Sequence, residues 1–383
     1  MPKNPFGIKN FCRLRFDGLF VIVYFCKNFH KKLSKKAFKR TNISNNTLKK
    51  GILKIDLRNY IVPSIPFALL LMAFIVALWF TDIFTPITFA YDFADKQPVN
   101  NLNNYFASHK LMSNILSLLL TGFNAYLIGL LNNRFTIIRA RSFLPVLFFI
   151  FLLSCWHDTH SLVFSHASLT LFILAIFVFF SAYHNNLATE QAFLSSLLIA
   201  TASLIFEPLI FLIPILWIGF ILFRSLSFRM LLATLIGVLT PWLIYITART
   251  YLQFDFLISN QIQSSFQIGL PVLNRPINEI IYLSGLFIIF IISIIGIYTE
   301  INNDSLKTRA YIHFIIILAL AAFILSMLFM RFFYVFLPFV AMPFAILVSY
   351  PITLKKNNFY RILFIIFVLI NLTYVASNIY QNN

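Results

Sequence analysis

Residues 311–350 read YIHFIIILAL AAFILSMLFM RFFYVFLPFV AMPFAILVSY, and Arg331 is the only Lys, Arg, Asp or Glu among them. A helix needs about 20 apolar residues to cross a hydrocarbon core of roughly 30 Å. The stretch therefore predicts two membrane-spanning helices with Arg331 at their connection. The rest of the chain is similar, because 60% of the 383 residues are hydrophobic, 11% are charged and the mean hydropathy is +0.85. These values predict an all-α, polytopic membrane protein and are not those of a soluble globular domain.

The apolar runs predict eleven transmembrane helices, since helices satisfy every backbone hydrogen bond within the lipid. The third run is short, and the fifth and sixth are alternatively one re-entrant pair around Glu207 and Pro208. The predicted spans are residues 62–80, 111–131, 142–156, 167–183, 190–206, 208–224, 230–247, 280–298, 311–330, 332–350 and 359–378.

The positions of the basic residues predict the orientation. If the N-terminus is cytoplasmic, 25 of the 30 Lys and Arg lie on the cytoplasmic side, which is the known bias of membrane proteins. An odd number of spans then places the C-terminus outside. The net charge of +18 reflects this topology and an attraction to anionic lipid, so no nucleic-acid partner is predicted. The five exceptions on the outer side are Lys96, Lys110, Arg249, Arg275 and Arg331.

The chain divides by composition into a basic cytoplasmic segment, residues 1–60, and a helical transmembrane domain, residues 61–383. Fifteen basic residues in the first segment stand against two acidic ones. Two interpretations remain open for it, a basic interfacial helix on the cytoplasmic leaflet and a basic tail. The three cysteines have neither the spacing of a disulfide framework nor that of a zinc site.

Most other ionisable residues gather at the predicted outer face. Asp82, Asp92 and Asp95 lie in the first outer loop, and Glu207 lies at the tip of a later hairpin. Carboxylates at an interface serve as general bases, bind a divalent cation, or are solvated loop charges. Glu207 stands out, because it directly follows an apolar run at a depth where an unpaired carboxylate is costly.

A histidine-rich segment follows the third predicted span, with His157, Asp158, His160 and His166. Its spacing lacks the helical i, i+4 pair of the usual zinc sites, so we predict no metal and no other cofactor. His157 and Asp158 are candidates for hydrogen bonds to a substrate or a lipid headgroup. An ordinary polar loop is the alternative.

Arg331 is the most specific candidate for binding a phosphate. Its planar guanidinium group offers two parallel hydrogen bonds in a partly dry site. The alternative is an interface anchor beside the aromatic residues that follow it.

The segment Arg331–Pro338, followed by Pro343, resembles the late helices of multi-spanning glycosyltransferases that use polyprenyl-phosphate sugar donors (GT-C-like enzymes). The hairpin Ser203–Trp242 is also similar in layout, with an acid before Pro208, a basic inner loop and Pro241 before Trp242. The adjacent Asp-Glu pair that is usual in the first outer loop of those enzymes is absent. The chain also resembles bacterial multi-pass membrane proteins of similar size to which no activity is assigned.

The resemblance implies that a sugar is transferred from a polyprenyl-phosphate donor at the extracytoplasmic face of a bacterial inner (cytoplasmic) membrane. Arg331 and Arg249 would then hold the phosphate, and Asp92, Asp82 or Asp95 would take the proton of the acceptor hydroxyl. The implied partner is a membrane lipid, and protein partners stay open. The alternative is a non-enzymatic scaffold or a transport component of an envelope complex. Ion-coupled transport is disfavoured, because the spans contain almost no charge.

Overall fold

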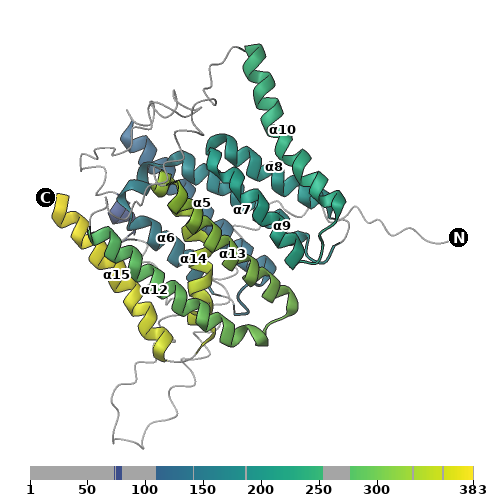
Figure 1. The fold of residues 1–383 in the computed structure, drawn as a ribbon. Coiled ribbons are helices and arrows are strands. Elements are labelled where there is room, and N and C mark those ends of the chain that lie inside the picture. The colour runs from purple at the N-terminus through teal and green to yellow at the C-terminus, as the bar shows by residue number, and fades with distance from the viewer. Residues whose placement is uncertain are drawn as a thin grey trace, which may run out of the picture. The chain divides into compact units, whose positions relative to one another are not determined.

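The computed structural model describes residues 73, 75–79, 109–140, 142–185, 188–252, 277–329, 332–355 and 358–382. The described residues form helices joined by short connections, with no β-strand among them (Figure 1). The prediction of an all-α, multi-pass membrane protein is confirmed for this part of the chain. Of the first predicted span, 62–80, only residues 73 and 75–79 are described, and they are helical. The basic segment 1–60 lies outside the described residues.

The α-helices are α5 (Lys110–Phe135), α6 (Leu144–Ser154), α7 (Val163–Ser181), α8 (Thr189–Ile205), α9 (Ile213–Leu222), α10 (Phe228–Leu252), α12 (Ile277–Glu300), α13 (Leu306–Leu328), α14 (Phe333–Leu354) and α15 (Asn358–Asn382). Three short 3₁₀-helices connect some of them: η2 (His157–Ser161), η3 (Glu207–Leu212) and η5 (Ile301–Asn303).

Seven of the described helices are long and apolar enough to cross a membrane: α5, α7, α10, α12, α13, α14 and α15. The third, fifth and sixth predicted spans correspond to shorter elements. Helix α6 has 11 residues and α8 has 17, whereas η3 and α9 together run from Glu207 to Leu222. Each is shorter than the 20 or so residues that a full crossing needs. Glu207 and Pro208 do form the turn between α8 and the following segment, as the hairpin predicts.

Helix α14 forms the core of the bundle. It packs against α6, α7, α12, α13 and α15, and 94% of its apolar window is buried. Its apolar sequence allows this burial, but α12 is more hydrophobic and only 33% buried, so packing selects α14 as the core helix. Three prolines inside it, Pro338, Pro343 and Pro351, are tolerated in the membrane because neighbouring helices surround the weakened backbone. By contrast, only 22% of the apolar stretch of α10 is buried. Helix α10 packs on α8 (Figure 1).

Contacts between distant segments define two ends of the bundle. At one end, which we call the aromatic end, Trp156 lies against rings from the starts of α12 and α14 and from α15. At the other, the basic end, Arg139 reaches Asn303, and Thr353 donates a hydrogen bond to Ser142. The basic residues predict that successive connections lie on alternate sides of the membrane, and the two groups of contacts agree with that alternation.

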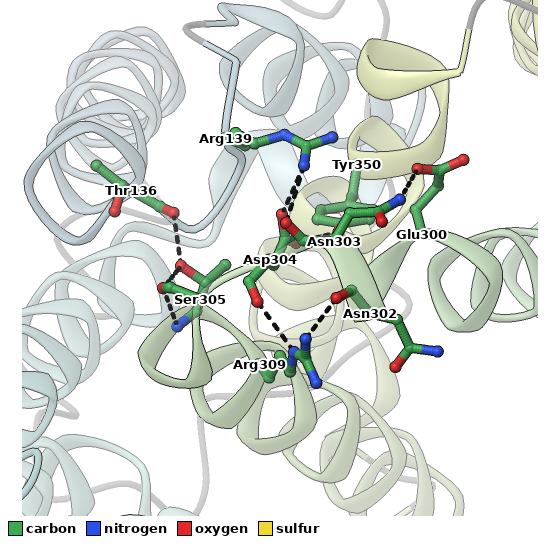
Figure 2. A network of polar contacts seen from close by, with 10 residues as sticks. Thr136, Arg139, Glu300, Asn302, Asn303, Asp304, Ser305, Arg309 and Tyr350 are labelled. Atoms are coloured by element: carbon green, nitrogen blue, oxygen red, sulfur yellow. Dashed lines mark hydrogen bonds and ion pairs between the residues drawn. The ribbon is translucent and has the colours of Figure 1, made fainter.

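A polar network at the basic end holds the connection between α12 and α13 (Figure 2). The Asp304 side chain is only 1% exposed, accepts a hydrogen bond from the Tyr350 hydroxyl, and lies 3.6 Å from Arg139 Nη1. The backbone carbonyl of Asp304 accepts from Arg309 Nε at 3.0 Å, and that of Asn303 accepts from Arg139 Nη1 at 3.1 Å. Arg139 from the connection between α5 and α6 and Arg309 from α13 thus bind one turn, which ties that connection to the start of α13.

Candidate functional site

Trp156 is the centre of the aromatic end. Helix α6 ends at Ser154, and the chain turns through Cys155 and Trp156 into η2. The Trp156 side chain is 1% exposed, and its ring centroid lies 5.4 Å from Tyr282, 5.8 Å from Tyr334 and 5.2 Å from Tyr374. Rings from α12, α14 and α15 therefore converge on one indole, at a position where amphipathic aromatic residues suit a membrane interface.

A buried acid lies beside these rings. Glu279 is 3% exposed in the first turn of α12, and its Oε1 accepts a hydrogen bond from the Tyr334 hydroxyl at 3.2 Å. A negative charge is favourable at a helix N-terminus, which partly offsets the cost of burial. Tyr282 stacks on Tyr374 with centroids 4.1 Å apart. Asp158 lies in η2, two residues after Trp156, and Tyr334, the partner of Glu279, packs on Trp156, so both acids belong to the aromatic end.

The histidines of this region are engaged in the packing of the bundle. His160 stacks on Trp79 with centroids 4.0 Å apart, and Trp79 donates to Ser154 Oγ at 3.0 Å. His166 Nε2 is 3.0 Å from the carbonyl oxygen of Thr159, to which only a protonated nitrogen can donate. Among the described residues, no three His, Cys, Asp or Glu are grouped so that they could hold a metal ion.

The described residues contain four of the predicted site residues in part or in full. His157 and Asp158 lie half-buried in η2, at the aromatic end. Arg249 lies in α10, although its side chain is not described. Asp82, Asp92, Asp95 and Arg331 fall outside the described residues, so their predicted roles stay predictions.

Glu207, the fourth, is the first residue of the turn between α8 and α9. It is half-buried, and its Oε1 is buried without a hydrogen-bond partner. Burial raises the pKa of this carboxyl group. The neighbouring Phe206 packs on Phe332 and Phe336 at centroid distances of 5.7 and 4.8 Å. Glu207 therefore lies near the start of α14, as Glu279 does, and joins Glu279 and Asp158 as a third acid at the aromatic end.

An apolar cavity of about 90 Å³ adjoins Trp156. Its walls come from α6, α12, α13 and α14, and residues such as Leu283, Phe287, Leu320 and Phe333 line it. The aromatic end thus places carboxyl groups next to an apolar space within the membrane-spanning part of the bundle. This arrangement suits an amphipathic molecule, with polar groups at the helix ends and an apolar part between the helices.

Comparison with protein families places the chain in one of them. Residues 100–382 match a family of unknown function, DUF6427. The chain belongs to this family. No curated protein and no solved structure matches it. The part that matches DUF6427 contains Asp158, Glu207 and Glu279, whereas Asp82, Asp92 and Asp95 precede residue 100. The DUF6427 region therefore carries its own acids at the aromatic end.

Sequence reasoning did not select Glu279, a buried acid of the DUF6427 region. Glu279 belongs to a group of outer-face charges, and its position in the sequence does not separate it from Arg275 or Asp255. One signal was available, because Glu279 is the acid that begins a long apolar run. Its partner Tyr334 is 55 residues away in sequence and comes close only in the folded bundle.

Proposed function

We propose that this protein is a membrane-embedded transferase that acts on a lipid-linked substrate at the extracytoplasmic face. The carrying observation is the buried carboxyl group of Glu279, hydrogen-bonded by Tyr334 at the aromatic end beside an apolar cavity. A buried carboxylate is costly and is retained where it has a partner or a task. The resemblance to polyprenyl-phosphate-dependent glycosyltransferases supports a sugar as the transferred group and a bacterial inner membrane as the location.

In this proposal the acceptor oxygen forms a bond with the sugar carbon as the bond from that carbon to the donor phosphate breaks. A carboxylate takes the proton of the acceptor hydroxyl, and the phosphate leaves with the bonding electrons. Glu279 is the base that its burial favours, with Tyr334 orienting it. Asp92, in the first outer loop, is the base that the resemblance implies. Arg331, with Arg249, would stabilise the negative charge on the departing phosphate.

The experiment compares variants in a strain from which the gene is deleted, with envelope glycans measured by mass spectrometry. We expect the wild-type gene to restore a missing glycan and Glu279→Gln to lose at least a hundredfold of that product, the usual scale for a proton-transfer group. Glu300→Gln is the matched control, since it makes the same change at the other end of α12. Asp92→Asn and Arg331→Gln test the groups that the resemblance implies.

Each result assigns or removes a role. Full activity of Glu279→Gln would exclude Glu279 as the base, and full activity of Asp92→Asn would exclude Asp92. If both retain activity, neither acid is the base, and if the deletion changes no glycan, transferase activity toward a sugar is refuted. Equal expression of all variants in the membrane, measured by immunoblot, is required for each comparison.

The second candidate, a non-enzymatic scaffold, is favoured by α10. Its apolar side chains are widely exposed, including Leu239 at 54% and Ile244 at 63%. Such a face packs against either lipid or a partner helix. A scaffold needs no base, so Glu279→Gln and Asp92→Asn would keep their function. Leu239→Ala combined with Ile244→Ala would lose it, which is the opposite of the pattern that a transferase predicts.

A further inference from the structure

The ends of three helices meet around one lysine at the basic end. Lys355 is the C-cap residue of α14, and its ammonium group donates hydrogen bonds to Thr299 Oγ1 and to Tyr360 Oη, the second at 3.1 Å. Thr299 belongs to the last turn of α12 and Tyr360 to the first turn of α15. Helices α12 and α15 pack side by side (Figure 1). The lysine therefore lies at the seam between these two helices.

Close packing fixes the two hydroxyl groups that hold this lysine. A Cβ atom at Gly296 would lie 2.7 Å from Tyr360 Oη and 3.0 Å from Pro351 Cβ, so the glycine lets the tyrosine hydroxyl approach α12 closely. The Tyr360 ring centroid lies 4.8 Å from the Lys355 ammonium nitrogen. Thr299 donates its own proton to the carbonyl oxygen of Gly296 at 2.8 Å, so its oxygen is left to accept from the lysine. Three elements thus orient one ammonium group.

The partners of Lys355 are neutral. In the part of the chain that the structure describes, no carboxylate forms an ion pair with it. Glu300, the acid next to Thr299, instead accepts a hydrogen bond from Asn303 at 3.2 Å. An ammonium group has three donors and two are used here, and Tyr360 donates its hydroxyl proton to no described acceptor. A half-buried cation with two unused donors beside it favours an anionic acceptor at this point.

An apolar surface leads away from the lysine along the seam. Ile295 lies one turn before Thr299 on the same face of α12 and is 60% exposed. On α15, Ile362 follows Tyr360 by two residues and is 55% exposed. Both helices are apolar enough to cross a membrane, so in a membrane this surface faces the hydrocarbon of the lipid chains. A ligand with an anionic group at Lys355 and an apolar part along the two helices fits this surface.

We propose that Lys355 and Tyr360 bind the phosphate of an anionic phospholipid, with Thr299 orienting the ammonium group. A phosphate oxygen accepts from the third N–H of Lys355 and from the Tyr360 hydroxyl, and the acyl chains lie against α12 and α15. A free phosphate ion offers the same oxygens but gains nothing from the apolar surface, so both parts of the site favour the lipid. The site lies at the opposite end of α12 from Glu279 and does not depend on the proposed transfer reaction.

The test measures lipid binding by native mass spectrometry. The full-length protein, delipidated in a nonionic detergent, is titrated with phosphatidylglycerol, and the apparent Kd of the first bound lipid is determined. We expect Tyr360→Phe to weaken this Kd about fivefold or more, because it removes one donor to the phosphate without changing the charge. Tyr298→Phe is the matched control, since it makes the same change at the same end of α12 on a side chain that is 52% exposed.

A second pair of variants separates this site from general attraction by charge. Lys355→Gln should weaken the Kd about tenfold or more, because it removes the ammonium group that faces the phosphate. Lys307→Gln removes one exposed positive charge elsewhere at the basic end and should weaken the Kd less than about twofold. Equal losses in the two lysine variants, or in the two tyrosine variants, would refute the site.

Competing ligands test the class of the occupant. Phosphatidylcholine, which is uncharged overall, should bind about fivefold or more weakly than phosphatidylglycerol. Equal binding of the two lipids would overturn the anionic assignment, and displacement of the lipid by millimolar inorganic phosphate would make a free ion the occupant. Glu279→Gln should bind phosphatidylglycerol as the wild type does, so loss of transfer and loss of the lipid site are separate results. If Lys355→Gln does not fold, as judged by size-exclusion chromatography, the tyrosine pair decides.

Discussion

Two acids at opposite ends of α12 are each bound by a tyrosine of α14. Glu279 in the first turn accepts a hydrogen bond from Tyr334, and Asp304, just after the helix, accepts one from Tyr350. Both residues are buried, with 3% of Glu279 and 7% of Asp304 exposed when the whole residue is counted. A hydroxyl donor reduces the cost of a buried carboxylate, and the two pairs fix α12 against α14 at both ends. The Asp304 pair has Arg139 beside it, whereas the Glu279 pair lies at the ring cluster around Trp156.

The Tyr350 pair is expected to contribute to stability. Tyr350→Phe removes the hydroxyl donor and leaves Asp304 Oδ2 without this partner, which should cost about 1–3 kcal/mol in the free energy of unfolding. Tyr298→Phe is the control, since Tyr298 is 52% exposed and should change stability by less than about 0.5 kcal/mol. Unfolding of the purified protein in mixed detergent micelles measures both. Equal stability of the two variants would show that the Tyr350 hydroxyl bond contributes nothing.

At the scale of elements, α10 depends on a close approach to α8. A Cβ atom at Gly237 would lie 2.1 Å from Ser196 Oγ and 2.6 Å from the backbone oxygen of Phe193. Small residues at such contacts allow membrane helices to pack through their backbones. Trp242 also donates to Ser203 Oγ at 3.2 Å, so polar and close contacts act together along this helix pair. Because α10 has little other burial, this pair determines its position.

Gly237→Ala should therefore separate the two helices. We expect a loss of about 1–3 kcal/mol, because the oxygen of Phe193 belongs to the backbone and cannot rotate away. Gly122→Ala is the matched control, since nothing lies within 4 Å of the added Cβ and alanine favours a helix by up to about 1 kcal/mol. Thermal unfolding in detergent compares the two. A Gly237→Ala protein as stable as Gly122→Ala would contradict the close approach.

At the scale of the whole molecule, the contacts and the charges describe the same two ends. Arg139, Lys307, Arg309 and Lys355 all belong to the basic end, where Arg139 and Arg309 bind the connection between α12 and α13. The acids Asp158 and Glu279 belong to the aromatic end. The positive-inside rule predicts that the basic end faces the cytoplasm.

Cysteine labelling tests this orientation. Ile277 and Leu306 begin α12 and α13 at opposite ends and are 71% and 75% exposed. In a chain without Cys12 and Cys26, Ile277→Cys should react with a membrane-impermeant maleimide in spheroplasts. Leu306→Cys should react only after lysis. Cys155 provides the background, because it is 3% exposed and should react in neither case. The reverse labelling pattern would invert the topology.

The predicted spans lie close to the observed helices where the apolar runs are long. Spans predicted at 311–330 and 332–350 correspond to Leu306–Leu328 and Phe333–Leu354. The length of an apolar run follows directly from the thickness of the bilayer, so the sequence carries it. The shorter elements α6, α8 and α9 lie where spans are predicted, but their lengths do not decide whether they cross, so the number of spans stays a prediction.

The amino-acid sequence by itself determined the class of protein, most helix positions and the grouping of charges, because each depends on local composition and on the bilayer. Only the tertiary structure decided that Glu279 meets Tyr334, that rings from three helices surround Trp156, and that an apolar cavity lies between α6, α12, α13 and α14. These features depend on which faces of distant helices meet. In an apolar sequence most faces look alike, so side-chain packing rather than hydrophobicity selects the neighbours.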